Sequence, residues 1–122
     1  MNMKLELVPV PVTDVDKAID FYVNKIGFNL DHDHNVSEEV RFVQLTPPGS
    51  ACSILIGKGV TQMSPGSQQG LQVVVDDAQA VYEMLKEKGV DAPAVETMPW
   101  GTFTFFSDPD GNKWAVQQLP QY

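Results

Sequence analysis

Two stretches of the chain show the same succession of hydrophobic and polar patterns. The first opens with an extended segment, residues 4–12, where leucines and β-branched residues alternate with other residues and two prolines exclude a helix. Residues 13–27 then carry apolar positions at helical spacing, with capping residues at the start and Gly27 at the end. Three more apolar segments predict strands at residues 28–34, 40–46 and 51–57.

The second stretch repeats this order about 63 residues later. Residues 58–69 have no periodicity and predict a linker. A strand is then expected at residues 71–75, followed by a helix that runs to Lys88 and stops at Gly89. The remaining strands are predicted at residues 94–98, 102–107 and 113–119, the last two joined by a hairpin turn at 108–112.

These repeats predict an α+β fold made of two tandem βαβββ modules. The first module spans residues 1–57, the linker 58–69 and the second module 70–122, and together they are expected to form one structural domain. Because one such module cannot bury a sheet face alone, we expect the two to pair across an approximate two-fold axis. The product would be a curved eight-stranded mixed sheet around a cleft, with the helices outside.

The charge balance narrows the classes of function. Acidic residues outnumber basic ones 16 to 8, the formal net charge is -8, and Arg41 is the single arginine. Nucleic-acid binding needs a basic surface, so that class is excluded. No apolar run approaches the roughly 18 residues of a membrane span. The first residues lack a signal-peptide pattern, and we therefore expect a cytoplasmic protein.

Several motifs together resemble the vicinal-oxygen-chelate superfamily, which includes glyoxalases, bleomycin resistance proteins and extradiol dioxygenases. The resemblance covers residues 5–119 and is carried by Val-Pro-Val-Thr-Asp at 10–14, Ala18, Phe-Tyr at 21–22, Gly-Phe at 27–28 and Phe-Ser-Asp-Pro-Asp-Gly-Asn-Lys-Trp at 106–114. It implies the paired-module fold predicted above. It leaves the activity open, because such a fold carries many unrelated functions.

The resemblance also implies where a metal would bind. Enzymes of this superfamily hold a divalent ion with His, Gln or Glu side chains at four places, one on each of four strands facing the cleft. Counted by register, these places fall at Leu7, Leu55, Gly70 and Ala115, and none of these residues carries a donor atom. The sequence therefore predicts a metal-free protein without a cofactor.

Displaced metal ligands are the alternative. Glu6 and Gln72 lie one and two residues from two of the expected places, and His32 and His34 would share one face of a strand. A solvent-exposed hairpin end accounts for the two histidines more simply, since spacing suggests no further ligand.

Four residues are predicted to contact a ligand. If Val43 and Val116 pack against their helices, then Phe42, Gln44 and Gln117 face the cleft. Trp100 lies in a loop and is expected to line the cleft as well. An apolar pocket with a few polar groups is typical of a small-molecule site.

The resemblance implies a homodimer. We predict that it binds a small organic molecule of cationic or aromatic character, the former because of the acidic charge. One alternative is a metal-dependent lyase or dioxygenase of the glyoxalase type, using ligands such as Glu6, His32 or His34. Another is an interaction module with an empty cleft. No residue is singled out as catalytic, although Glu96 or His32 would be a base if it lay near the cleft.

Overall fold

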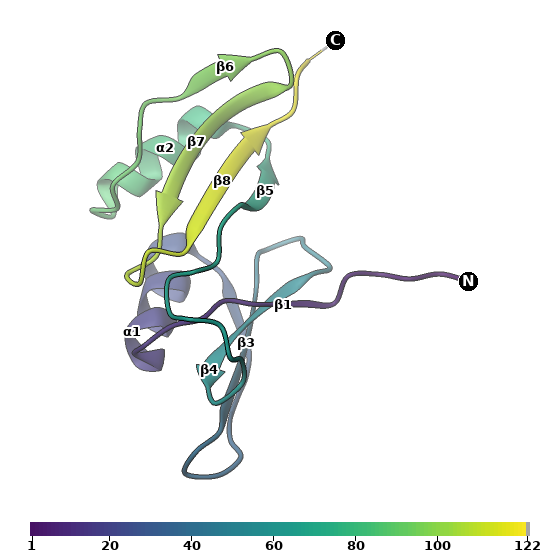
Figure 1. Cartoon of the computed structure of the whole chain (residues 1–122). Coiled ribbons are helices and arrows are strands. Elements are labelled where there is room, and N and C mark those ends of the chain that lie inside the picture. Colours follow the sequence, from purple (N-terminus) through teal and green to yellow (C-terminus); the bar gives the residue numbers. More distant parts are fainter. Residues whose placement is uncertain (122) are drawn as a thin grey trace. The chain divides into compact units, whose positions relative to one another are not determined.

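The computed structural model describes residues 1–121, which divide into two compact units. The first unit comprises residues 1–68 together with 108–112, and the second comprises residues 69–107 and 113–121. Each unit holds one four-stranded mixed sheet and the helical segment that follows its first strand (Figure 1). This confirms the predicted α+β class with two tandem modules, and the eight strands are shared equally between two sheets.

In the first unit the sheet order is β1-β4-β3-β2. Strand β1 is parallel to β4, whereas the other pairs are antiparallel. The elements are β1 (Leu7–Pro9), α1 (Val15–Asp20), the π-helical η1 (Phe21–Ile26), β2 (Asn29–Asn35), β3 (Arg41–Thr46) and β4 (Ser53–Lys58).

The second unit has the same topology, in the order β5-β8-β7-β6, with β5 parallel to β8. Its elements are β5 (Leu71–Val75), α2 (Ala78–Glu87), β6 (Glu96–Met98), β7 (Gly101–Ser107) and β8 (Lys113–Gln118).

The first strand is shorter than the nine residues predicted. β1 spans Leu7–Pro9 only, and two backbone hydrogen bonds extend its pairing with β4, from Ser53 to Glu6 and from Val10 to Leu55. Pro11 has no N–H group with which to continue the ladder. Its carbonyl oxygen instead accepts hydrogen bonds from the Gly66 backbone and the Asn112 side chain.

The single helix predicted at residues 13–27 is two segments in the structure. Asp14 caps α1 by accepting a hydrogen bond from the Lys17 N–H at 3.1 Å. From Phe21 the turns widen to a π-helix, whose last N–H groups, on Gly27 and Phe28, both donate to Tyr22. Gly27 ends the segment at φ 93°, a conformation that favours glycine.

One face of each sheet is buried beneath its helix. In the first unit α1 contacts β4, and Val43 and Leu45 on β3 are completely buried. In the second unit α2 contacts β7 and β8, where Trp114 and Val116 are buried. These four side chains confirm the alternation predicted for β3 and β8. Each unit thus has its own apolar core on the helix side of its sheet.

The turn at residues 108–112 belongs to the first unit and is held there by a buried polar network. The Asp108 carboxylate accepts hydrogen bonds from the Tyr22 hydroxyl at 2.8 Å and the Asn112 amide at 2.7 Å. Its other oxygen accepts from the backbone N–H groups of Asp110 and Asn112. Asn112 also donates to Pro11. Both oxygens of the Asp108 carboxylate are therefore paired, which avoids the cost of an unsatisfied buried carboxylate.

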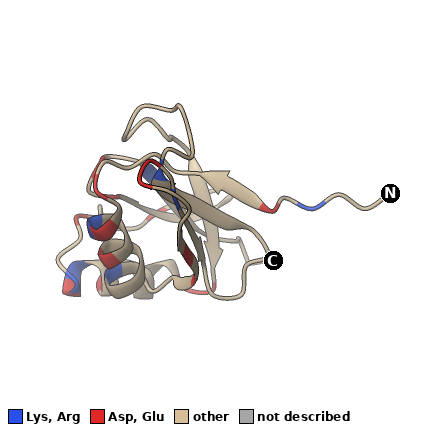
Figure 2. Cartoon of the chain, turned by 90° about the horizontal axis from the view of Figure 1, so that it is seen from below, with Lys and Arg blue, Asp and Glu red and all other residues tan. Residues whose placement is uncertain are grey.

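Both helices contain acidic and basic residues, which are coloured red and blue in Figure 2. Among residues 1–121 no helix is both long and apolar enough to cross a membrane.

Candidate ligand-binding faces

The sheet of the first unit has a second face that its helix does not cover, here called the first open face. On β3 this face holds Phe42, Gln44 and Thr46, which are half-buried. Strand pairing adds the residues opposite them, since cross-strand partners share a face. The first open face thus comprises Leu7, His32, His34, Phe42, Gln44, Thr46, Ser53 and Leu55.

A row of polar groups crosses the first open face. The Gln44 amide donates to the Ser53 hydroxyl at 3.1 Å, and that hydroxyl lies 2.6 Å from the hydroxyl of Thr46. Thr46 in turn donates to Asp31, which sits at the bulge of β2. The side-chain amide oxygen of Gln44, Oε1, accepts no hydrogen bond from residues 1–121, so it is available to a ligand.

His32 and His34 lie on this face beside the predicted ligand contacts. Register places His32 opposite Gln44 and His34 opposite Phe42. The two imidazole rings are stacked, with centroids 5.7 Å apart, and both residues are exposed. Both histidines thus lie on the first open face. They also lie on β2, an edge strand of the sheet, where they are exposed to solvent as the interpretation of a hairpin end predicted.

The corresponding face of the second unit, here called the second open face, is more apolar. It comprises Gln72, Val74, Glu96, Phe103, Phe105, Ala115 and Gln117, with Trp100 in the turn between β6 and β7. Trp100 is 61% exposed, Val74 59% and Phe105 39%. Large apolar side chains gathered on one face in this way mark an interaction surface.

Two glutamines fix the turn that carries Trp100. The Gln72 amide donates to Gln117 at 2.7 Å, and the Gln117 amide donates to the Trp100 backbone carbonyl at 2.9 Å. Gly101 lies so close to β8 that an added Cβ would approach the Gln118 carbonyl oxygen to 2.5 Å. Glycine therefore lets the turn lie against β8, and the backbone of Trp100 is positioned while its side chain remains exposed.

The four predicted ligand contacts fall into two pairs. Phe42 and Gln44 belong to the first open face, and Trp100 and Gln117 are in direct contact on the second. Alternation along β7 also predicts that Phe103 and Phe105 share a face, and the register agrees. The prediction did not include Val74, the register partner of Gln117, or the hydrogen bond between Gln72 and Gln117.

The places where the resemblance puts metal ligands hold no donor side chain. Leu7, Leu55 and Ala115 lie on the open faces, and Gly70 comes directly before β5 at φ 77°. Aliphatic side chains and glycine offer neither nitrogen nor oxygen to an ion, so these residues do not fit a metal. Among residues 1–121, no group of three or more His, Cys, Asp or Glu side chains is arranged to hold one elsewhere.

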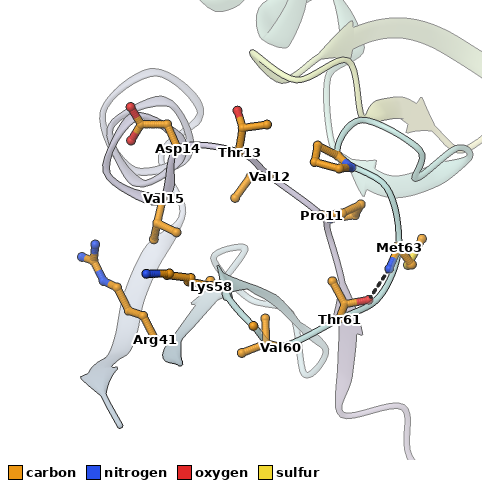
Figure 3. A pocket seen from close by; sticks show the side chains of 13 residues that line it. Pro11, Val12, Thr13, Asp14, Val15, Arg41, Lys58, Val60, Thr61 and Met63 are labelled. Carbon is orange, nitrogen blue, oxygen red and sulfur yellow. Dashed lines mark hydrogen bonds between the residues drawn. The ribbon is translucent and has the colours of Figure 1, made fainter. Parts of the chain in front are cut away.

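A cavity of about 530 Å³ lies in the first unit (Figure 3). Its lining consists of residues 11–15, residues 57–61, Arg41, Met63 and Pro65. The sequence did not predict it, because its walls come from the β1–α1 connection and from the segment interpreted as a linker.

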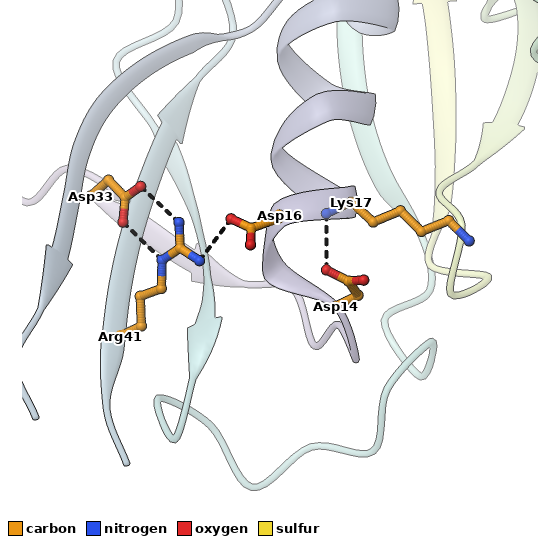
Figure 4. A network of polar contacts seen from close by, with 5 residues as sticks. All are labelled: Asp14, Asp16, Lys17, Asp33 and Arg41. Carbon is orange, nitrogen blue, oxygen red and sulfur yellow. Dashed lines mark hydrogen bonds and ion pairs between the residues drawn. The ribbon is translucent and has the colours of Figure 1, made fainter. Parts of the chain in front are cut away.

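Arg41 links three elements beside this cavity (Figure 4). Its guanidinium donates two hydrogen bonds to Asp33 on β2 and one to Asp16 on α1, all at 2.9 Å. The hydrogen bonds from Arg41 hold the pKa of Asp33 below its ordinary value, and those to Asp33 and Asp16 raise the pKa of Arg41. Arg41 is thus permanently charged, and the carboxylates of Asp33 and Asp16 balance its positive charge.

Comparison with known proteins agrees with this architecture. The crystal structure of TnmS3, described as an antibiotic binding protein from Streptomyces sp. CB03234, matches with a TM-score of 0.90 and 37% identity, covering 98% of each chain. A glyoxalase/bleomycin resistance protein from the same source matches with a TM-score of 0.84 and 38% identity, covering 94% of this chain and 100% of the other. The uncharacterized protein YetH of Bacillus subtilis (strain 168) is 31% identical, over 97% of this chain and 100% of its own length.

The family assignment rests on most of the chain. The sequence model of one superfamily matches residues 4–116, a range that includes every strand and helix of both units except the last two residues of β8. The paired βαβββ topology and the structural matches agree with it. The chain therefore belongs to the Glyoxalase/Bleomycin resistance protein/Dioxygenase superfamily.

Proposed function

We propose that this protein binds a small organic molecule on its open sheet faces without the help of a metal ion. The observation that carries the proposal is Trp100, which is 61% exposed and whose backbone carbonyl accepts a hydrogen bond from Gln117. An exposed indole on a positioned turn offers a flat apolar surface to a ligand. The 37% identity to the antibiotic binding protein TnmS3 supports the same class of function.

The side chains around Trp100 suggest the character of the ligand. Val74, Phe103 and Phe105 give an apolar wall, and Phe103 stacks on Phe105 with centroids 6.1 Å apart. Such a wall suits an aromatic ligand. The formal charge of -8 adds a long-range attraction for cations. An aromatic molecule with an amine group is therefore the favoured class, with Phe42 and Gln44 as further proposed contacts.

The test is a titration followed by tryptophan fluorescence and calorimetry. Bleomycin and a series of aromatic amines are added to the wild-type protein and to Trp100→Ala. We expect saturable binding of at least one compound to the wild type and a loss of about tenfold or more in affinity in the variant, as for a buried aromatic anchor. Val36→Ala, an exposed apolar truncation in the β2–β3 hairpin, is the matched control and should bind normally.

Each outcome of this titration separates two classes of function. Equal affinities for wild type and Trp100→Ala would contradict the role given to the second open face. No binding of any compound would favour an interaction module over a binding protein.

A metal-dependent lyase or dioxygenase is the second candidate. The stacked pair of His32 and His34 on the first open face favours it, because two imidazoles on one face of a strand can share an ion. Glu6, the further ligand of this alternative, precedes β1 at the opposite edge of the sheet from β2, and it forms no metal-holding group with the two histidines. Turnover of a glyoxalase or dioxygenase substrate that a chelator abolishes, and that His32→Ala and His34→Ala abolish too, would establish it.

We also propose that the protein is a homodimer in the cytoplasm. Val74, Phe105 and Trp100 are large apolar side chains exposed in the second unit, and such side chains often mark interaction surfaces. A second copy covering part of this surface would bury it and could complete the binding site. Sedimentation velocity over a range of concentrations tests the proposal, and a monomer throughout would contradict it.

A further inference from the structure

The cavity of the first unit is built by two segments that are each fixed at both ends. One wall is the β1–α1 connection, residues 11–15, and the other begins in the last residues of β4 and continues through residues 59–65. Figure 3 shows side chains from both segments around the opening. Its volume of about 530 Å³ is within the range of pockets that bind small molecules.

The 59–65 wall is held by close backbone contacts that only glycine permits. An added Cβ on Gly59, at φ 70°, would come within 2.5 Å of the Glu39 carbonyl oxygen. On Gly66, at φ 78°, it would come within 2.1 Å of the Asp110 carbonyl oxygen. Gly66 also donates its N–H to Pro11 at 3.1 Å. This wall is therefore closely packed at both ends.

The opposite wall is fixed by the turn at residues 108–112. The Thr13 hydroxyl donates to Asp110 at 2.7 Å, and the Thr13 N–H donates to the same carboxylate at 3.2 Å. Pro11 accepts from Asn112 at 2.8 Å. Both walls are thus positioned by the same short turn, and the space between them is formed before any ligand enters.

The lining combines an apolar surface with one unbalanced cation. Pro11 is buried, and Val12, Val60 and Met63 are half-buried around the cavity. Arg41 also lines it, but two carboxylates balance its charge. The ammonium group of Lys58 donates to the Glu38 backbone carbonyl at 2.8 Å and forms no ion pair with any residue of 1–121.

Two groups in this lining, the Lys58 ammonium and the Thr61 hydroxyl, can still donate hydrogen bonds to a ligand. An ammonium group has three N–H donors, and the hydrogen bond from Lys58 to the Glu38 carbonyl oxygen uses one of them. The Thr61 hydroxyl accepts from the Met63 N–H at 3.2 Å and keeps its own proton to donate. Asp14 is the one carboxylate in the lining, and one of its two oxygens accepts the hydrogen bond that caps α1. The cavity therefore favours acceptors over donors in a ligand.

We propose that this cavity is a second small-molecule site, distinct from the open faces, which takes an organic acid with an apolar body. The carboxylate would contact Lys58, and the apolar body would lie against Val12, Val60 and Met63. A ligand here would bridge the β1–α1 connection and the end of β4, whose Leu55 is on the first open face.

The experiment is a titration of isotopically labelled protein with octanoate, octylammonium and octan-1-ol, followed by backbone amide NMR signals. We expect octanoate to shift the amides of residues 12–15 and 57–63 in a saturable way and to bind more tightly than the other two. Lys58→Gln should weaken octanoate binding about fivefold, as expected for one partly exposed charge pair, without changing that of octan-1-ol.

Two control variants separate this site from the rest of the molecule. Lys25→Gln removes an exposed lysine of the same unit that does not line the cavity, and it should bind octanoate normally. Trp100→Ala should also bind octanoate normally, so failure of the proposed function leaves this test unaffected. Shifts confined to residues 72–74 and 100–105, no saturable shift, or equal affinity for octanoate and octylammonium would each overturn the proposal.

Discussion

At the scale of single residues, the buried carboxylate of Asp108 is the group that depends most on its hydrogen-bond donors. It lies in a turn that hydrophobic patterning would place at the surface, and it is 5% exposed. Four donors surround it, two from side chains and two from the backbone. Because a buried carboxylate tolerates few missing partners, each donor should contribute measurably to stability.

Tyr22→Phe tests this contribution. The substitution keeps the ring and removes the hydroxyl that donates to Asp108 at 2.8 Å. We expect the free energy of unfolding to fall by about 1 to 3 kcal/mol, since a buried charged acceptor loses a donor. Tyr82→Phe on α2 is the control, with a change of no more than about 0.5 kcal/mol. Urea denaturation measures both, and equal effects of the two substitutions would contradict the role of the hydroxyl.

Gly66 tests the packing of the cavity wall. Gly66→Ala meets both a positive φ of 78° and a backbone oxygen at 2.1 Å, whereas Gly49→Ala has φ 81° with nothing within 4 Å. We expect Gly49→Ala to cost about 1 kcal/mol from backbone strain alone. Gly66→Ala should cost at least about 1 kcal/mol more, because the backbone must also move apart. Similar unfolding free energies for the two variants would show that the contact is not tight.

At the scale of elements, Arg41 joins β2, β3 and α1 through its contacts with Asp33 and Asp16 (Figure 4). Because Arg41 lowers the pKa of Asp33 in the folded protein, the unfolded chain binds a proton more readily at this position. The contribution to stability is therefore present at neutral pH, above the unfolded pKa of Asp. It is lost as the pH falls through the lower folded value.

Arg41→Gln should reproduce that dependence. At pH 7 we expect a loss of roughly 1 kcal/mol in the free energy of unfolding, the upper range for an exposed ion pair with two hydrogen bonds. The difference between wild type and variant should shrink below about pH 4, near the ordinary pKa of Asp. Urea denaturation at several pH values gives the comparison, and NMR titration of Asp33 should show a higher pKa in the variant. A difference independent of pH would contradict this account.

The strands and α2 could be predicted because their signals are local. Alternation identified the buried positions Val43 and Val116, and Asp77 and Gly89 marked the ends of the second helix. The change to a π-helix at Phe21 depends on how the Gly27 and Phe28 N–H groups pair with Tyr22, which no periodicity encodes. The short β1 reflects pairing lost after Pro11, a loss whose position depends on the partner strand.

The candidate sites divide in the same way. Parity along a strand was enough to place Phe42, Gln44 and Gln117 on open faces, and Trp100 was predicted from its loop setting. The cavity lay beyond sequence reasoning because residues 11–15 and 57–61 meet only in the folded unit. The Gln72 and Gln117 contact was missed since strand pairing, rather than sequence spacing, brings the two amides together.

At the scale of the whole molecule, the superfamily includes enzymes, whereas the residues at the places expected for a metal offer no donor atoms. The superfamily's description includes glyoxalases and dioxygenases, yet the places where the resemblance implies metal ligands hold Leu7, Leu55, Gly70 and Ala115. The exposed Trp100 and the 37% identity to an antibiotic binding protein favour recognition of a small molecule. Metal independence is therefore the central claim, and it can be measured without knowing the ligand.

The decisive measurement is the metal content of untagged protein by mass spectrometry, after incubation with zinc, nickel, manganese and iron and then dialysis. The account predicts that the wild type retains far less than one ion per chain, because the residues at the four places offer no donor atoms. Close to one tightly held ion per chain or per dimer would contradict it. Loss of that ion in His32→Ala or His34→Ala would then assign it to the stacked histidines and restore the metal-dependent alternative.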